Sequence, residues 1–181
     1  MNKLTLILLI SLILTSCKDN KENVNGTSNI SSEYKINEDE TLTLLLKAKI
    51  EKDDKFKFCY LNEGQEQLKG DQKVEINVKG SSEIQELEFR TSSTEIPTKL
   101  FLMFGNDEKY QSIEFESAEI QLNENTFQIS KTVFFQFFNP NGYIDYDKEN
   151  AVATCKAVEG EYGPWFMSRD ILIDRLLLEF D

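Results

Sequence analysis

Residues 42–60, LTLLLKAKIEKDDKFKFCY, decide the fold class, because apolar side chains recur at every second position in both halves of this stretch. The alternating apolar residues are Leu42, Leu44, Leu46, Ala48 and Ile50, followed by Phe56, Phe58 and Tyr60. A period of two places successive side chains on opposite faces of a strand. One apolar face and one polar face are typical of antiparallel sheets that pack together on one side only.

The same alternation continues as far as Leu122. It runs through Val74 to Val78, Leu87 to Phe89, Leu100 to Phe104 and Ile113 to Leu122. Turn-forming residues, such as Lys69-Gly70-Asp71, separate these runs. Seven or more short strands in about 100 residues are typical of a β-sandwich. We therefore predict a mainly β protein built as an antiparallel β-sandwich.

One of the predicted strands has an irregular phase. Its apolar positions slip by one residue between Phe115 and Ala118, after which Ile120 and Leu122 continue the alternation. A β-bulge adds one residue to a strand and restores the phase beyond it. We therefore predict a bulge at this point.

The last third of the chain predicts two short C-terminal helices. Ser130 could cap a helix over residues 131–138, which would end before the turn Asn139-Pro140-Asn141-Gly142. Ser168 could cap a second helix over residues 169–180. The apolar face of that helix would consist of Leu172, Ile173, Leu176, Leu177 and Phe180. Residues 34–181 are thus expected to form a single β-sandwich domain with a helical extension.

The N-terminus predicts a targeting signal over residues 1–16. Lys3 precedes an apolar run, residues 4–14, that is too short to span a bilayer. Leu14-Thr15-Ser16-Cys17 resembles the lipobox of bacterial lipoproteins, which implies that Cys17 is lipidated and becomes the first residue of the mature chain. An ordinary secretory signal is the alternative. Residues 17–33, polar after the cysteine, then form a flexible tether.

The lipobox resemblance implies a place in the cell envelope, with the membrane as a partner through the N-terminal lipid. The Lys18-Asp19 step resembles an export signal of lipoproteins in some Gram-negative lineages, although Asn20 stands where a second acidic residue is expected. An outer-membrane lipoprotein that is exposed at the cell surface is therefore expected. The inner leaflet of the outer membrane is the alternative.

The body of the chain resembles a second family. Residues 73–80, 84–89, 96–105 and 113–120 are similar to the strands of galactose-binding-like jelly rolls, the architecture of many carbohydrate-binding modules. The resemblance covers residues 40–122 and implies a sandwich of jelly-roll type with glycan-binding function. It assigns no binding residue, because such modules place their sites on different loops or faces.

Composition excludes several classes of function. The 181 residues include 20 Lys and Arg against 32 Asp and Glu, a formal net charge of −12, which argues against a nucleic-acid partner. The chain has no histidine, which excludes Ser-His-Asp and Cys-His catalysis and His-ligated zinc. It also has no glycine-rich phosphate loop, so no nucleotide is expected. We expect a non-enzyme, with a carboxylate-based glycoside hydrolase as the alternative.

Two segments near the C-terminus carry candidate ligand-binding residues. Sugars are bound by aromatic faces and by Asn or Asp side chains that meet hydroxyl groups. The candidates are Asn141, Tyr143, Asp145, Tyr146, Asp147 and Trp165. The alternative is a turn followed by an edge strand whose tyrosines close the end of the sandwich, and a tryptophan that anchors its loop to the core.

The same segment offers oxygen ligands for a cation, and two cysteines remain beside Cys17. Asp145 and Asp147, with Asn139 and Asn141, are hard ligands suited to a structural calcium ion, and no other cofactor is expected. Cys59 and Cys155 could form a disulfide in an oxidising compartment, or remain two separate reduced thiols.

These features together predict a non-catalytic binding module for a glycan at the cell surface. The alternative is an accessory subunit of an envelope or surface assembly that works through protein–protein contacts. An exposed cluster with Trp165 or the tyrosines would favour the first, and a flat exposed apolar patch would favour the second.

Overall fold

The computed structural model describes residues 40–105 and 110–180. The predicted signal peptide, Cys17 and the tether lie outside the described residues. Within the described part of the chain, no helix combines the length and the apolar character needed to cross a membrane.

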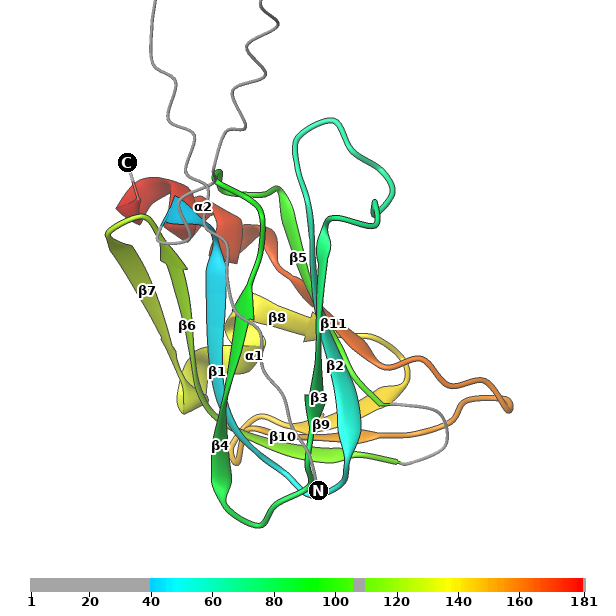
Figure 1. Cartoon of the computed structure of the whole chain (residues 1–181). Helices are drawn as coiled ribbons and strands as arrows, with labels where there is room; N and C mark the ends of the chain where they lie inside the picture. The colour runs from blue at the N-terminus through cyan, green and yellow to red at the C-terminus, as the bar shows by residue number, and fades with distance from the viewer. Residues whose placement is uncertain (1–39, 106–109, 181) are drawn as a thin grey trace, which may run out of the picture. The chain divides into compact units, whose positions relative to one another are not determined.

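The described residues form two antiparallel sheets packed face to face (Figure 1), which confirms the predicted β-sandwich. The six-stranded sheet runs β4 (Ile84–Arg90), β1 (Thr43–Ile50), β6 (Ser112–Leu122), β10 (Val152–Cys155) and β9 (Ile144–Asp147), and β7 (Asn125–Ser130) also pairs with β6. The five-stranded sheet runs β3 (Lys73–Val78), β2 (Asp54–Leu61), β5 (Lys99–Met103), β11 (Trp165–Ser168) and β8 (Phe138–Pro140). The finer assignment to the jelly-roll type stays a prediction.

The core lies between the sheets and consists of the residues that the alternation assigned to it. Leu42, just before β1, and Leu44 and Leu46 within it are at most 1% exposed, as are Phe56 and Phe58 of β2. In β3 the alternation is less fully buried, since Val74 and Ile76 are half-buried. In a strand, residues at every second position lie on the same face, so the apolar residues of an alternating run are buried together. The local pattern and the observed burial therefore agree.

The predicted β-bulge is confirmed. Lys47 of β1 pairs with Ser117 of β6, but the next residue, Ala48, pairs with Phe115. Glu116 is therefore the extra residue, and it is exposed. Because of this one insertion, Phe115 and Ala118 both face the core.

Both predicted helical segments exist, but their caps differ from the prediction. A 3-10 turn η2 (Lys131–Val133) and a short helix α1 (Phe134–Phe137) form the first, and Ser130 makes no side-chain cap hydrogen bond. Helix α2 (Asp170–Glu179) begins after Arg169, and Ser168 is not its cap. The Ser168 hydroxyl is buried in β11 and accepts a hydrogen bond from the backbone N–H of Leu100, 2.9 Å away, so a sheet contact takes the oxygen that a cap would need.

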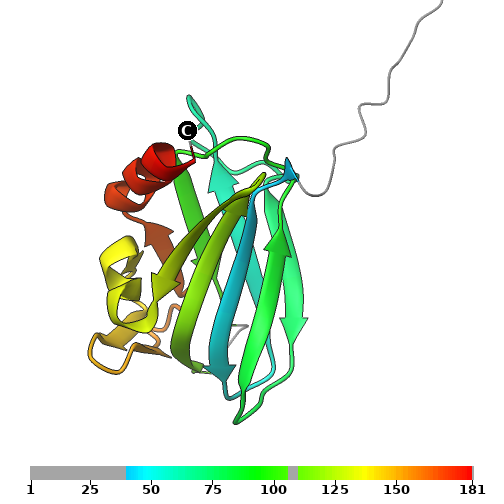
Figure 2. The same cartoon turned by 90° about the vertical axis from the view of Figure 1, so that its left-hand side faces the viewer.

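The two helices lie beside the six-stranded sheet near β7 (Figure 2). Leu172, Ile173 and Leu176 of α2 are buried, as predicted. Leu177, which the helical pattern placed on the same face, is 47% exposed. The buried stripe of α2 is thus narrower than its apolar pattern, and the helix covers only part of the sandwich edge.

The predicted disulfide is corrected by the structure, in which Cys59 and Cys155 are free, buried thiols. Cys155 belongs to the core cluster, whereas Cys59 alternates with core residues of β2 and lies on the opposite face, with its sulfur 4.0 Å from that of Met103. The five-stranded sheet therefore separates the two thiols. The alternative of two reduced cysteines describes the structure.

Neither thiol is expected to react with a maleimide reagent in the native protein at about pH 8. Both side chains are 1% exposed, and burial raises the pKa of Cys59 and raises the pKa of Cys155 to about 11, so thiolate is scarce at either sulfur. In urea both should react fully. A Cys59–Cys155 linked peptide in mass spectra of the unreduced protein would contradict this arrangement.

Candidate functional site

The segment from Asn139 to Asp147 crosses from one sheet to the other. Strand β8 is the last strand of the five-stranded sheet, β9 is the last of the six-stranded sheet, and residues 141–143 join them. The side chain of Asn141 organises this turn. Its amide nitrogen Nδ2 donates to the backbone carbonyl of Gly163 (2.7 Å), and its oxygen Oδ1 accepts from the backbone N–H of Tyr143 (3.2 Å). The turn and edge strand of the alternative interpretation are both present.

The other candidates on this segment also have partners within the protein. Asp145 forms an ion pair with Lys156, and the Tyr143 hydroxyl donates to Glu161 at 3.2 Å. Burial and the bond to Glu161 raise the pKa of Tyr143. Asp147 accepts bonds from the backbone N–H groups of Glu149 and Asn150 and from the Asn150 side chain, which lower its pKa. Tyr146 is 40% exposed and rests against Phe135, with the ring centroids 4.9 Å apart.

These side chains do not converge on one point. Among residues 40–105 and 110–180 there is no group of three or more carboxylate or thiol side chains that could hold a metal ion. Asp145 faces Lys156 and Asp147 organises the turn at Asn150, so the two carboxylates serve different local structures.

Trp165 lies elsewhere, on the outer face of the five-stranded sheet. It alternates with Phe166 and Ser168, which are buried, and it is itself half-buried. Its ring meets that of Phe101 edge to face, with centroids 6.1 Å apart and an interplanar angle of 72°. Among the predicted site residues, Asn141 is bonded to it, since the Trp165 carbonyl accepts from the Asn141 backbone N–H at 3.0 Å. The tryptophan therefore belongs to a sheet face and not to the β9 edge.

Strand register places other side chains in two rows with Trp165 and Phe101. The first row is Glu75, Lys57, Met103 and Trp165, on β3, β2, β5 and β11. The second row is Lys73, Cys59, Phe101, Met167 and Asn139, from β3 to β8. Side chains that are directly opposite on adjacent strands lie about 5 Å apart. We call these two rows, together with Lys55 one pleat along β2, the outer-face site.

Of the outer-face site, sequence reasoning had singled out Trp165, Cys59 and Asn139, and Asn139 only as a possible cation ligand; it missed the other members. A signal exists in β5, where Phe101 and Met103 are large apolar residues out of phase with Leu100 and Leu102. An apolar residue on the polar side of a strand marks a face that is not simply solvated.

Three lysines of the outer-face site surround one carboxylate. The Lys73 ammonium lies 2.9 Å from Glu75, while those of Lys57 and Lys55 lie 3.7 Å and 3.9 Å from the same carboxylate. The hydrogen bond from Lys73 is the main cause of the lowered pKa of Glu75. The cluster has three positive charges and one negative charge, so it remains cationic near neutral pH.

A pocket of about 260 Å³ opens beside this cluster. Its walls include Lys55, Lys57, Met103, Gly105, Gly163 and Pro164. Gly105 has a φ of +80°, and a Cβ there would come within 2.6 Å of the Pro164 ring, so glycine permits this wall. The buried carboxylate of Asp54 holds the wall in place, because it accepts from the Gly105 N–H at 2.9 Å.

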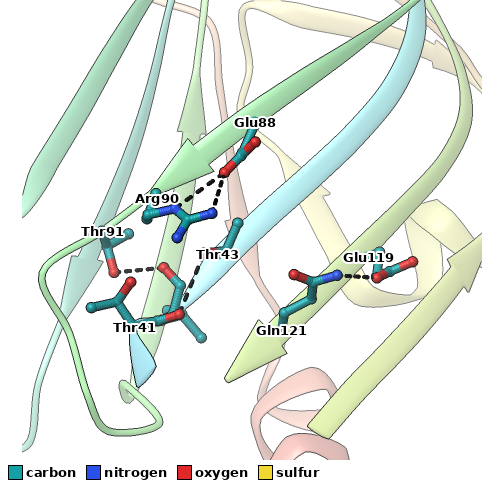
Figure 3. A network of polar contacts seen from close by, with 8 residues as sticks. Thr41, Thr43, Glu88, Arg90, Thr91, Glu119 and Gln121 are labelled. Carbon is teal, nitrogen blue, oxygen red and sulfur yellow. Dashed lines mark hydrogen bonds and ion pairs between the residues drawn. The ribbon is translucent and has the colours of Figure 1, made fainter. Parts of the chain in front are cut away.

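The outer face of the six-stranded sheet has a different chemistry. Figure 3 shows Glu88 bonded to Arg90 on β4, and Glu119 bonded to Gln121 on β6. Polar side chains on this face are paired with one another, both along a strand and across strands, as in the pair of Lys47 on β1 with Glu86 on β4. The two outer faces differ in sign and in aromatic content, and the five-stranded sheet carries the candidate site.

We compared the chain with protein-family models, with curated proteins and with solved structures, and found no significant match in any of the three.

Proposed function

We propose that this protein is a lipid-anchored, non-catalytic binding protein of the cell envelope, and that it binds a glycan across the outer-face site. The observation that carries the proposal is the half-buried Trp165 with Phe101 on an open sheet face beside a pocket. Aromatic rings pack against the C–H faces of sugars, and neighbouring polar groups bond their hydroxyls. Lipidation at Cys17 would hold this domain at the membrane through the tether.

The outer-face site has the dimensions of an extended binding surface. Its first row crosses four strands, and three strand spacings of about 4.8 Å make it about 14 Å long. A short oligosaccharide laid along that row would meet Trp165 at one end and Lys57 near the other. Because the side chains stand on paired strands, little ordering is required on binding.

Trp165→Ala is expected to lower glycan affinity at least about tenfold, because large aromatic side chains contribute most to such contacts. The assay uses the mature chain from residue 17 with Cys17→Ser, which carries no lipid, on a glycan array followed by calorimetry of each hit. Tyr146→Ala is the matched control, since it removes a half-exposed aromatic ring from the edge of the other sheet.

Loss of binding in Trp165→Ala with retention in Tyr146→Ala would support the outer-face site. The reverse result would place the ligand at the β9 edge, with Tyr143, Asp145 and Asp147. A folded sample that binds no glycan would contradict the proposed function.

One observation favours the accessory-subunit alternative. Helix α2 exposes Ile171, Leu177 and Leu178, which are 54%, 47% and 74% exposed. Ile171 and Leu178 are seven residues apart and therefore share one side of the helix. A protein partner at this apolar strip would be the next hypothesis if the array is blank.

A further inference from the structure

We infer that the glycan is acidic, with sugars that carry carboxylate groups, and that Lys55 and Lys57 bind these carboxylates in the pocket beside Trp165. This inference rests on the proposed function, because it names the chemistry of the ligand for the same site. The charge of the sheet face, the surroundings of the two lysines and the position of the pocket each support it.

The sheet face is a positive region on an acidic protein. The outward positions of the five-stranded sheet carry Lys55, Lys57 and Lys73 against Glu75, and Lys99, which pairs with Asp170 of α2, while the whole chain has a formal net charge of −12. The outer face of the other sheet carries the acidic Glu86, Glu88, Glu114 and Glu119 against the basic Lys47, Lys49 and Arg90. Complementary charge brings an anionic ligand to the lysine face, and the acidic remainder of the surface repels it.

Lys55 and Lys57 retain the capacity to bind a second carboxylate. At 3.9 Å and 3.7 Å from Glu75, their ammonium groups are beyond hydrogen-bond distance of it, and their side chains are 42% and 39% exposed. An ammonium group has three N–H donors. Because neither lysine donates a hydrogen bond to Glu75 at these distances, those donors remain available for a ligand carboxylate. The cluster already binds one carboxylate, that of Glu75, through Lys73. A carboxylate is also the group that we assign to the ligand.

The pocket connects the lysines with the aromatic part of the site. Lys55, Lys57 and Met103 line it, and Met103 is paired with Trp165 on the adjacent strand. Lys57 and Trp165 are thus two strand spacings apart, about 10 Å. A glycan chain whose ring packs on Trp165 can therefore direct a carboxylate of a neighbouring sugar into the pocket.

The test compares uronate oligosaccharides from pectin and from alginate with the same oligosaccharides after methyl esterification, which removes the charge and keeps the sugar. Calorimetry uses the lipid-free Cys17→Ser chain at about 0.05 M and about 0.5 M NaCl. We expect the acid form of at least one oligosaccharide to bind at least about tenfold more tightly than its ester at low salt. The difference should shrink at high salt, since the lysines are exposed and screened.

Lys55→Gln combined with Lys57→Gln should lower affinity for the acid form about 5–30-fold and affinity for the ester by a clearly smaller factor, because glutamine keeps polar contacts with the sugar and removes only the charge. Lys47→Gln is the matched control, because Lys47 is an exposed lysine paired with Glu86 on the other sheet. The Lys47→Gln variant should bind the acid form with the same affinity as the unmodified chain.

Equal binding of acid and ester forms, abolished by Trp165→Ala, would overturn the inference and keep the proposed function. Binding of a neutral glycan with no uronate binding would do the same. Equal affinity for sulfated glycans or single-stranded oligonucleotides of the same charge would also overturn it, because the face would then select charge alone. Absence of binding to every glycan would remove both proposals.

Discussion

Deletion of Lys47 is expected to abolish cooperative unfolding, whereas deletion of Glu116 should leave the protein folded, with its free energy of unfolding lowered by no more than about 1–2 kcal/mol. The two deletions are matched, because each removes one exposed charged residue and the residues belong to adjacent, paired strands. They differ in their effect on the alternation of buried and exposed residues: the first deletion breaks it in β1, and the second restores it in β6.

Without Lys47, the residues of β1 beyond Leu46 change face. Ile50 would turn toward solvent, which forfeits about 1.5–3 kcal/mol of burial, and Lys49 would turn toward the core, where an unpaired charge is far more costly. Strand β1 pairs without irregularity with β4, so a shift cannot be absorbed on that side. The combined loss is comparable with the whole stability of a small domain, about 5–15 kcal/mol.

Without Glu116, the strand keeps its faces. Ser117 would follow Phe115 directly, and the alternation from Ile113 to Leu122 would be unbroken. The ion pair with Lys131, at 4.0 Å, is exposed and contributes little. Urea unfolding followed by near-UV circular dichroism measures both variants. Equal destabilisation by the two deletions would show that Glu116 is not the inserted residue.

Phe134→Ala is expected to lower the free energy of unfolding by about 3–5 kcal/mol. Phe134 is 1% exposed and is the centre of an aromatic cluster in the core. Its ring stacks on Phe115 and Phe138, with centroids 4.0 Å and 5.0 Å away, and meets Phe166 edge to face at 5.7 Å. Alanine would remove these contacts and leave a cavity that rigid neighbouring rings cannot fill.

Two controls separate packing from helix formation. Phe134→Leu keeps most of the apolar volume and should cost less than Phe134→Ala. Phe137→Ala removes a phenylalanine from the same short helix α1, but that side chain is only half-buried, so its cost should also be smaller. Chemical denaturation of the three variants gives the comparison. Similar losses for Phe134→Ala and Phe137→Ala would indicate that α1 itself, and not the aromatic cluster, is the sensitive element.

Local pattern predicted much of the fold. The period of two identified the core residues of β1 and β2 because burial of one face follows from strand geometry alone. The phase slip after Phe115 located the bulge for the same reason. The capping predictions failed, because the Ser168 hydroxyl is used by Leu100, a residue distant in sequence, and a local rule does not include such a competitor.

The candidate site was predictable only in part. Trp165 and the edge segment were identified by residue type, but their positions on different sheets were not. The disulfide prediction was wrong for a related reason. The sequence identified Cys59 and Cys155 as the two cysteines left after Cys17, but not that the five-stranded sheet lies between them. Residue type indicates what chemistry a side chain can perform, and not which side chains it will meet.

The sequence by itself determined which face of each strand is buried, the point at which β6 needs an extra residue, and the acidic character of the chain. Only the tertiary structure decided that Lys57, Met103 and Trp165 form one row, because strand order and register between distant segments bring them together. Alternation is a property of neighbouring residues and is visible in the chain. Strand order depends on the packing of the whole domain, so the outer-face site exists only after the sheet has formed.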